Sequence, residues 1–226
     1  MKNSNLLKLE NENNFMLSII IPAHNEEKYI ESCLKSIKQQ KYSNYEIIVV
    51  CDSCTDKTKQ IAKKYTKKVY EIKKKNVSCA RNTGARKATD DVLVFLDADC
   101  VIAPNLLVEM CSAIEQGYIG GLTKTNSLED LWKANMMWAI GNFFRHFYIT
   151  ASGVFFCKAN FFTGYDESRH LAEDTDLLLK LKKKGKLKYI TNSYIKTSSR
   201  RLEAEGYCWT IFRQFSAFFT KTKKGY

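Results

Sequence analysis

The sequence contains little of the material from which flexible or repetitive proteins are built. Only 2 prolines and 10 glycines occur among its 226 residues, and no internal repeat or low-complexity tract is present. A content of 45% hydrophobic and 12% aromatic residues excludes an intrinsically disordered chain. The length suits one sizeable domain with an elaborated end.

Long apolar runs are also missing. No window approaches the ~18 uncharged apolar residues that a membrane span needs, and residues 1–15 lack the apolar stretch and cleavage site of a signal peptide. We therefore expect residues 1–15 to be a polar lead-in. We expect the protein to be cytoplasmic, either soluble or peripheral on the inner face of the cell membrane.

Neither common glycine-rich phosphate-binding motif is present. G-x-G-x-x-G does not follow the first apolar run, and G-x-x-x-x-G-K-[ST] occurs nowhere. Sites of the dinucleotide-cofactor and P-loop types are therefore unsupported. A diphosphate ligand would have to be neutralised by a metal ion and by side chains.

The eight cysteines have no disulfide-framework spacing. Several lie in apolar stretches, where we expect small buried side chains. Cys51 and Cys54 form a C-x-x-C pair, for which a redox pair or half a zinc site is the alternative interpretation. No second pair stands at ligand spacing and the proline typical of redox loops is absent, so ordinary packing is favoured.

The net charge of +12 is unevenly distributed. Residues 57–88 and residues 177–226 each carry a net charge of +11, whereas residues 89–176 carry −8. The basic blocks would suit nucleic acid, anionic lipid or a polyphosphate ligand. For most of these lysines, a solvated helix face or turn is the favoured interpretation.

Short β-branched runs alternate with segments of helical spacing. This alternation predicts βαβ units and a Rossmann-like α/β domain, with a mostly parallel sheet flanked by helices. Ligands of such sheets bind beyond the carboxyl ends of the strands, which here means just after residues 22, 50 and 96. The predicted strands are 17–22, 45–50, 69–72 and 92–96, and the predicted helices are 26–40, 56–67, 78–88 and 105–116.

Acidic side chains follow three of the predicted strands. Glu26 and Glu27 come after the first strand, Asp52 after the second, and Asp97-Ala98-Asp99 after the fourth. Carboxylates at positions i and i+2 share one face, and they repel each other unless a cation lies nearby. Oxygen ligands select a hard metal such as Mg²⁺ or Mn²⁺, which keeps open positions for phosphate oxygens. A solvated aspartate turn remains the alternative.

These blocks resemble family 2 glycosyltransferases, which have the GT-A fold. The resemblance runs in the family's order over about residues 17–190. It departs from the usual pattern at Ser53-Cys54, where Gly-Ser is frequent, and at Asn76–Cys79, where a glycine is common. The Gln-x-x-Arg-Trp motif of processive synthases is missing, which favours transfer of a single sugar. The blocks that carry the resemblance are 18–27, 48–56, 80–84 with 94–99, and 162–167 with 173–177.

The resemblance assigns roles to individual residues. It implies that Asp99 holds the metal, that Asp174 is the catalytic base and that Glu173 supports it. It also implies that Arg81 lies near the base or phosphates and Asp97 near the ribose. The donor-binding residues that we expect are Ala23, His24, Glu26, Asp52, Arg81, Asp97, Ala98 and Arg201.

Asp174 also stands out without the resemblance. Glu173, Asp174 and Asp176 precede a helical apolar pattern, where acids interact favourably with the helix dipole. For Asp176 we favour this capping role. Sugar transfer by single displacement needs one carboxylate to take a hydroxyl proton, and Asp174 is our candidate for it.

Three features keep alternative interpretations. The aromatic segments 131–148 and 206–226 are each predicted to be core, a dimer interface or a membrane-facing surface. Arg200 and Arg201 either reach a donor diphosphate or lie in a solvated turn. We expect a nucleotide-binding half at 16–100, an acceptor half at 101–200 and an aromatic, basic helical C-terminal extension at 201–226.

We therefore expect an inverting, Mg²⁺- or Mn²⁺-assisted glycosyltransferase. The expected donor is a UDP-sugar, with a GDP-sugar as the alternative, and the expected acceptor is a glycan or a lipid-linked hydroxyl. Further expected partners are an anionic membrane surface or a second copy of the chain, and not nucleic acid. The competing hypotheses are a sugar-phosphate nucleotidyltransferase and a basic module that binds polyanions or lipid surfaces.

Overall fold

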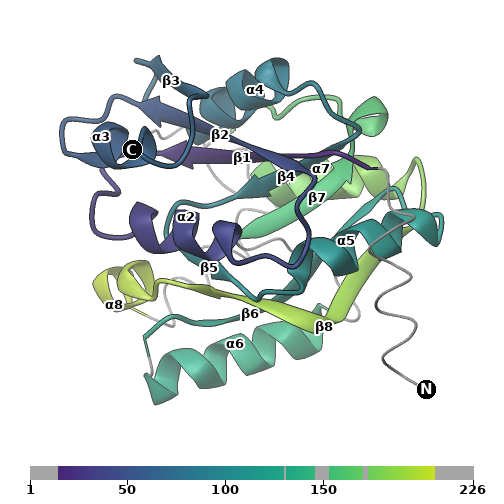
Figure 1. The fold of residues 1–226 in the computed structure, drawn as a ribbon. Helices are drawn as coiled ribbons and strands as arrows, with labels where there is room; N and C mark the ends of the chain where they lie inside the picture. Colours follow the sequence, from purple (N-terminus) through teal and green to yellow (C-terminus); the bar gives the residue numbers. More distant parts are fainter. Residues whose placement is uncertain (1–14, 130, 146–152, 170–172, 207–226) are drawn as a thin grey trace.

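The computed structural model describes residues 15–129, 131–145, 153–169 and 173–206. In these ranges the strands form one eight-stranded sheet of order β3-β2-β1-β4-β7-β6-β8-β5, with helices on both faces (Figure 1). Six strands run in one direction, whereas β7 and β5 oppose them. The expected mostly parallel α/β fold is confirmed.

The first four strands of the βαβ series are those that the sequence predicts. They are β1 (Leu17–Ala23), β2 (Tyr45–Asp52), β3 (Val69–Ile72) and β4 (Val92–Leu96). β1 lies between β2 and β4 and is parallel to both. Every residue of β1 and β4 is buried, so both faces of this part of the sheet are covered. The carboxyl ends of these strands therefore meet along one edge.

The remaining strands were not predicted. They are β5 (Cys100–Ile102), β6 (Gly120–Ser127), β7 (Val154–Lys158) and β8 (Leu187–Thr197). β6 has the sequence GGLTKTNS, which lacks an apolar run, and β8 contains a register shift opposite Thr123 and Lys124. β7 lies between β4 and β6 and is antiparallel to both. It thereby connects β6, β8 and β5 to the parallel strands β1 to β4.

Helices cover both faces of the sheet. α2 (Ile30–Lys38) and α5 (Leu106–Glu115) bury their apolar side chains in one core, and the short α3 (Thr58–Ala62) packs against α2. α4 (Val77–Lys87) and α7 (Glu173–Lys182) pack against the other face. The predicted helices 26–40 and 56–67 were too long, because α2 begins only at Ile30 and α3 spans five residues.

Two further helices lie toward the β6 side of the molecule. α6 (Trp132–Phe144) packs beside β6, at the bottom of Figure 1, and α8 (Arg200–Glu205) follows β8. A short 3₁₀ helix, Ala159–Phe161, follows β7. The expected aromatic segment at 131–148 is thus helical as far as Phe144. The expected helix at 206–226 lies outside the described residues, apart from Gly206.

A close contact between α4 and β1 sets the position of α4. A Cβ atom added at Gly84 would lie 2.3 Å from Cγ2 of Ile20, far inside van der Waals contact. Only glycine lets the helix approach the strand this closely. The helix begins at its N-cap Asn76, whose Oδ1 accepts the backbone N–H of Cys79 at 3.0 Å. This packing holds Arg81, one turn before Gly84, over the end of the sheet.

The described cysteines are free thiols, and most are buried as expected, although Cys54 and Cys79 are half-buried. Cys208 lies outside the described residues. Within the described ranges, no helix is long and apolar enough to cross a membrane.

Candidate active site

The predicted ligand edge is built around the Asp97–Asp99 turn, which follows β4. The backbone N–H of Asp97 donates to the carbonyl of Gly153 at 2.9 Å, and the carbonyl of Asp99 accepts from Ser198 N at 3.3 Å. The turn is therefore held by the residue before β7 and by the residue after β8. Strands that lie far apart in the sequence fix this carboxylate pair.

Arg81 joins three carboxylates on one side of this turn. Its Nη2 donates to Oδ1 of Asp97 at 2.8 Å, and its Nη1 donates to Oε1 of Glu173 at 2.8 Å. Nη1 also lies 3.2 Å from Oδ1 of Asp174. The guanidinium is buried, with its Cζ 5.2 Å from the ring centre of Tyr165. The expected Arg81, Asp97, Glu173 and Asp174 are thus brought together.

Asp174 lies in an environment that disfavours its charged form. Burial raises its pKa to about 7, and the negative charges of Glu173 and Asp97 act in the same direction against the opposing effect of Arg81. The single positive charge of Arg81 cannot neutralise three carboxylates. Asp174 therefore holds its proton up to a higher pH than a solvent-exposed aspartate does. A carboxyl group with a pKa near 7 suits acid–base chemistry at neutral pH.

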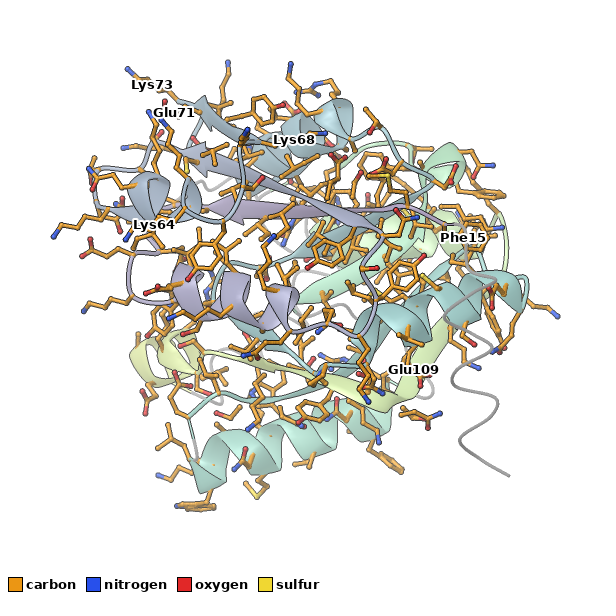
Figure 2. The ribbon with its side chains drawn as sticks, in the orientation of Figure 1. Phe15, Lys64, Lys68, Glu71, Lys73 and Glu109 are labelled. Atoms are coloured by element: carbon orange, nitrogen blue, oxygen red, sulfur yellow. The ribbon has the colours of Figure 1, made fainter. Side chains whose placement is uncertain are left out.

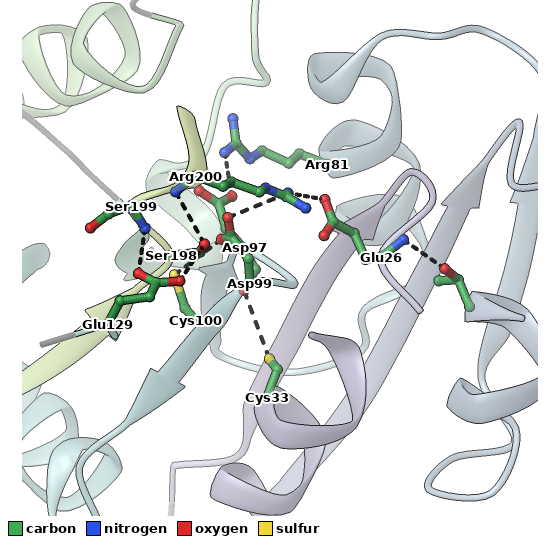
Figure 3. A network of polar contacts seen from close by, with 11 residues as sticks. Glu26, Cys33, Arg81, Asp97, Asp99, Cys100, Glu129, Ser198, Ser199 and Arg200 are labelled. Atoms are coloured by element: carbon green, nitrogen blue, oxygen red, sulfur yellow. Dashed lines mark hydrogen bonds and ion pairs between the residues drawn. The ribbon is translucent and has the colours of Figure 1, made fainter. Parts of the chain in front are cut away.

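Arg200 neutralises a second group of carboxylates on the other side of the turn. Its Nη2 donates to Oε1 of Glu26 and lies 3.4 Å from Oδ2 of Asp99 (Figure 3). The guanidinium also stacks over the ring of Tyr29, with Cζ 4.8 Å from the ring centre. Glu129 fixes the start of α8, because its carboxylate accepts from Ser198 Oγ at 2.8 Å and from Ser199 N at 2.7 Å.

The residues around Arg81 and those around Arg200 together carry more negative than positive charge. Five carboxylates, from Glu26, Asp97, Asp99, Glu173 and Asp174, surround the two guanidinium groups of Arg81 and Arg200. Burial, together with the charges of Asp97 and Glu26, raises the pKa of Asp99 to about 6. Oε2 of Glu26 is buried and has no hydrogen-bond partner among the described residues. The site therefore attracts a further cation.

The donor set fits a divalent hard cation that shares its coordination with a ligand. In the described part of the chain, no group of three or more His, Cys, Asp or Glu side chains is arranged to hold a metal ion by itself. Mg²⁺ is commonly bound by one or two carboxylates together with phosphate oxygens and water, and this arrangement does not need such a cage. Asp99, with Asp97 two residues away, can supply the protein ligands.

A cavity of about 680 Å³ opens beside this site, at the ends of β1 and β2. Asn25, Ser53 and Lys75 line it with positive φ angles of 54°, 55° and 49°. They are all of the non-glycine residues with positive φ in the described ranges. Strained backbone of this kind clusters at ligand sites. The cavity is lined by His24, Asn25, Ser53, Cys54, Thr55, Lys73, Lys74 and Lys75.

Asp52 supports the cavity from behind. Its Oδ1 accepts the backbone N–H groups of Lys74 at 2.8 Å and Lys75 at 2.9 Å, and its Oδ2 accepts that of Asn76 at 2.7 Å. Burial alone would raise the pKa of Asp52, but these backbone donors lower it overall. The carboxylate is thus engaged in holding the loop that forms one wall.

The other expected donor-binding residues divide between the wall and the interior. His24 lines the cavity, with Nδ1 2.6 Å from the carbonyl of Asp52. Ala23 and Ala98 are buried, each with 3% of its surface exposed. Arg201 is exposed on α8, and its charge is one of the influences that lower the pKa of Asp99.

Several contacts of the site have no signal in the sequence. Arg201 is the expected donor-binding residue of the arginine pair, and Arg200 is the one that contacts Asp99 and Glu26 in the structure. Tyr165, which belongs to the block 162–167, is a further residue of the site that the sequence does not single out. Its ring lies under Arg81, and its buried hydroxyl interacts with Asp174 closely enough for each group to influence the pKa of the other. No pattern distinguishes Arg200 from Arg201 before β8 is placed.

Comparison with solved structures identifies the fold. Glucosyl-3-phosphoglycerate synthase from Mycobacterium tuberculosis, in a complex with Mn²⁺, UDP and glucosyl-3-phosphoglycerate, superposes with a TM-score of 0.66 at 18% identity, over 89% of this chain and 78% of that protein. The mannosyltransferase PcManGT from Pyrobaculum calidifontis, in a complex with GDP-Man and Mn²⁺, also gives 0.66 at 17% identity, over 100% of this chain and 72% of that one. The fold is therefore GT-A.

Sequence relatives extend the comparison. Glycosyltransferase GlyA from Streptococcus pneumoniae is 36% identical over 88 residues, which are 37% of this chain and 13% of GlyA. The chain covers much less than two thirds of this relative's length. The sequence profile named glycosyl transferase family 2 matches residues 18–168, which is more than half of the chain. The chain therefore belongs to glycosyltransferase family 2.

Proposed function

We propose that the protein is an inverting enzyme that transfers one sugar from a nucleotide-sugar donor to an acceptor hydroxyl. The observation that carries this proposal is the position of Asp174. A carboxyl group with a pKa near 7 lies beside the Asp97–Asp99 turn at the ligand edge of the sheet. The same site contains two arginines and an excess of carboxylates. The carboxylates suit a metal ion, and the arginines suit the diphosphate of the donor.

The nucleoside of the donor is assigned to the 680 Å³ cavity. From there the diphosphate would extend toward Asp99, which we assign to Mg²⁺ or Mn²⁺ with Asp97 in support. When bound, such a cation stabilises the negative charge of the leaving diphosphate. The comparison structures of the synthase and of PcManGT both hold Mn²⁺, which supports this assignment. Arg81 and Arg200 supply further positive charge near the phosphates.

Asp174 is assigned the role of base. The acceptor O–H gives its proton to the Asp174 carboxylate while the hydroxyl oxygen forms a bond to the anomeric carbon. The bond from this carbon to the diphosphate breaks on the opposite face, so the configuration inverts. Glu173 acts through Arg81, because its carboxylate holds Nη1 of that arginine next to Asp174. Arg81 in turn keeps Asp174 oriented toward the site.

A UDP-sugar remains our leading donor and a GDP-sugar the alternative. One comparison structure contains UDP and another contains GDP-Man, so both bases are compatible with this fold. Melting curves of the purified chain with UDP, GDP, CDP and dTDP, with and without Mn²⁺, test the proposal. A ligand that binds only the folded state at one hundred times its Kd stabilises it by ~2.7 kcal/mol. A shift with one nucleotide that needs Mn²⁺ is expected.

The same panel separates the competing functions. A nucleotidyltransferase would bind nucleoside triphosphate together with sugar phosphate and release pyrophosphate, which a coupled assay detects. A module that binds only polyanions would show salt-sensitive binding without any nucleotide-dependent melting shift. Either result in place of Mn²⁺-dependent nucleoside diphosphate binding would contradict our proposal.

We also propose that the enzyme works at an anionic membrane surface and takes a glycan or lipid-linked acceptor. Trp132, Met136, Ile140, Phe143 and Phe144 lie along one face of α6 and are each more than half exposed. Residues 132–145 contain no carboxylate, and Lys133 is exposed beside Trp132, whereas Arg145 is buried and donates to Thr125 and Asn142. An apolar helical face without negative charge suits the interfacial region of an anionic bilayer. A second copy of the chain is the alternative partner.

A further basic surface lies at the opposite side of the sheet. Lys64, Lys68 and Lys73 extend from the α3 and β3 region (Figure 2). Lys68 pairs with Glu46, and Lys59 of α3 pairs with Glu71 at 2.5 Å. Except for that of Glu46, which is 8% exposed, the side chains of these pairs are accessible to solvent. The lysines thus pair with acids of their own chain at the solvated surface, where ion pairs contribute little to stability. We assign no nucleic acid partner to this surface.

A further inference from the structure

Two cysteines meet at the wall of the nucleoside cavity. Cys51 is the last but one residue of β2 and is 1% exposed, whereas Cys54 is half-buried and lines the cavity. Ser53 between them has a φ of 55°, which turns the chain sharply after the strand. The Cys54 thiol donates a hydrogen bond to the carbonyl of Ala23 at 3.3 Å and also interacts with the thiol of Cys51. Cys54 thus faces the ligand space, with Cys51 behind it.

Cys54 differs from the other described thiols in its electrostatic environment. Its hydrogen-bond interaction with Cys51, and to a smaller extent the backbone of Asn25 and the charge of His24, lower its pKa to about 7 against the opposing effects of burial and of the negative charge of Asp56. In the other described cysteines burial contributes to a raised pKa. Three lysines, Lys73, Lys74 and Lys75, line the same cavity, so an anionic molecule that enters it meets positive charge.

We propose that Cys54 is a thiol-modification site for small disulfides inside the nucleoside cavity, that Cys51 is its resolving thiol, and that modification prevents nucleotide binding. The chemistry that recognises the site is a soluble disulfide with anionic groups, which the three lysines attract. The last part of the inference rests on the proposed function, since it takes the cavity to be the nucleoside site.

The reaction balances with a low-molecular-weight disulfide as the oxidant. The Cys54 thiolate attacks one sulfur of this disulfide, a Cys54–sulfur bond forms, and the other half leaves as a thiolate that takes up a proton. Cys51 then loses its proton and attacks the Cys54 sulfur. A Cys51–Cys54 disulfide forms and the second small thiol is released. Two protein thiols are oxidised and one small disulfide is reduced.

Both products change the cavity. A mixed disulfide places the small thiol in the space that Cys54 lines. A Cys51–Cys54 disulfide draws the Cys54 sulfur away from the carbonyl of Ala23 and so alters the turn that continues into Thr55. The backbone N–H of Thr55 donates to Oδ1 of Asn25 at 2.8 Å, so a shift of the turn reaches the opposite wall.

Modification rates provide the first test. The full chain carrying Cys208→Ser is treated at pH 7 with oxidised glutathione, and adducts are located by peptide mass spectrometry. Cys79 is the internal control, because it is half-buried and its pKa is raised to about 11, mainly by burial. Thiolate fraction and nucleophilicity together predict that Cys54 reacts roughly 50-fold faster than Cys79. Equal or slower reaction of Cys54 would overturn the proposal.

Variants separate the two steps. Cys51→Ser should keep the glutathione adduct on Cys54, whereas the chain with Cys51 intact should lose the adduct and become two protons lighter. Cys54→Ser should leave Cys51 unmodified, because Cys51 is not reachable from solvent. A stable adduct on Cys54 when Cys51 is present would contradict the resolving role of Cys51. Modification of Cys51 in the Cys54→Ser chain would contradict it as well.

Nucleotide binding provides the last test. Reduced protein should show the melting shift with nucleoside diphosphate and Mn²⁺, the oxidised protein should lose it, and a thiol reductant should restore it. An equal shift before and after oxidation would overturn the blocking role. If the reduced protein binds no nucleotide at all, the proposed function fails instead, while the modification rates still decide whether Cys54 is the reactive thiol.

Discussion

The guanidinium of Arg200 lies 3.4 Å from Oδ2 of Asp99, so a side chain of the last described helix holds the carboxylate assigned to the metal. The same guanidinium binds Glu26, at the end of β1 (Figure 3). One positive charge faces two carboxylates, one of which has a buried oxygen without a partner among the described residues. A divalent cation therefore competes with Arg200 for the same oxygen atoms, and the two cannot both occupy the closest position.

Replacing Arg200 by Ala should affect metal and donor binding in opposite directions. Without the guanidinium, Asp99 and Glu26 lose their counter-charge, so Mn²⁺ should bind the donor-free protein more tightly. The donor should bind more weakly, because a cation near the diphosphate is lost. Calorimetry with Mn²⁺ alone and then with nucleoside diphosphate in saturating Mn²⁺ measures both effects. We expect each to be roughly tenfold, or about 1.4 kcal/mol.

Arg201 is the matched control for Arg200. It carries the same charge on the same helix and is exposed like Arg200, but it lacks the contacts that bind Arg200 to Glu26 and Asp99. Arg201→Ala should change either affinity by less than about threefold. Equal effects of the two substitutions would show that only the net charge of α8 matters.

Asp99→Asn should abolish Mn²⁺-dependent nucleotide binding and at the same time stabilise the metal-free protein. Burial raises the Asp99 pKa from 3.8 to about 6, so the folded state disfavours the ionised form. The destabilisation is absent below pH 4, develops between pH 4 and 6, and is fully present above pH 6. Removing the charge should therefore add roughly 1–3 kcal/mol to the free energy of unfolding at pH 8.

Urea denaturation without metal measures this effect. The stability difference between Asp99→Asn and the unchanged protein should shrink as the pH falls from 8 to 4. A variant that is less stable at pH 8 would mean that the contact with Arg200 outweighs the cost of burying the charge. Unchanged Mn²⁺-dependent nucleotide binding would remove Asp99 from the metal site.

The sequence predicted the first half of the fold because that half has a simple pattern. β1, β2 and β4 are buried on both faces, so they are continuous apolar runs that stand out from the amphipathic helices between them. The rule that ligands bind at the carboxyl ends of parallel strands then located the Asp97–Asp99 turn. β6 has one large apolar residue, Leu122, the apolar residues of β8 are interrupted by polar ones, and the pairing of the two strands contains a register shift, so no run marked them.

The limits of site prediction have the same origin. Asp97 and Asp174 could be selected singly, but their connection through Arg81 depends on Gly84, which allows α4 to approach β1. Arg200 reaches Asp99 only because β8 ends beside β5, where Thr197 pairs with Cys100. Long-range strand pairing of this kind has no local sequence signal.

The exposed face of α6 predicts binding to anionic membranes. Changing Trp132, Ile140 and Phe143 together to Ser removes three of its exposed apolar side chains. Flotation with vesicles of anionic phospholipid at low salt should recover the unchanged protein and recover the variant roughly tenfold less. Raising the salt concentration should weaken binding of the unchanged protein, because the basic residues contribute about 1 kcal/mol each at most.

Leu179 provides the control for this experiment. It is an exposed apolar residue on α7, 43% accessible, and α7 packs on the sheet face that α4 also covers. Leu179→Ser should not change flotation. Absence of flotation by the unchanged protein at low salt, together with a dimer that the α6 substitutions dissociate, would assign the face to a second copy of the chain.

The assignment of Asp174 leads to a prediction for the pH dependence of the reaction. A base must be ionised to accept the acceptor proton, and the Asp174 pKa is about 7. Below pH 7, kcat/KM should therefore fall about tenfold per pH unit, and above pH 7 it should level off. Asn resembles Asp in size but cannot take the proton, so Asp174→Asn should lower kcat by ~10²–10⁴-fold and remove this acidic limb. Donor affinity should change little, because Asp97, Asp99 and the cavity remain.

Asp176→Asn separates the base role from a helix-capping role. Asp176 lies in the same first turn of α7 and pairs with Lys180 at 2.7 Å, away from the Arg81 cluster. If Asp174 only stabilises the helix start, both substitutions should cost a few tenths of a kcal/mol in stability and leave kcat nearly intact, since Asn caps a helix about as well as Asp. If Asp174 is the base, only its own substitution lowers kcat.

NMR of the product provides an independent measurement, because a single displacement turns an α-linked donor into a β-linked product. Retained configuration would exclude the direct displacement for which Asp174 is proposed as the base.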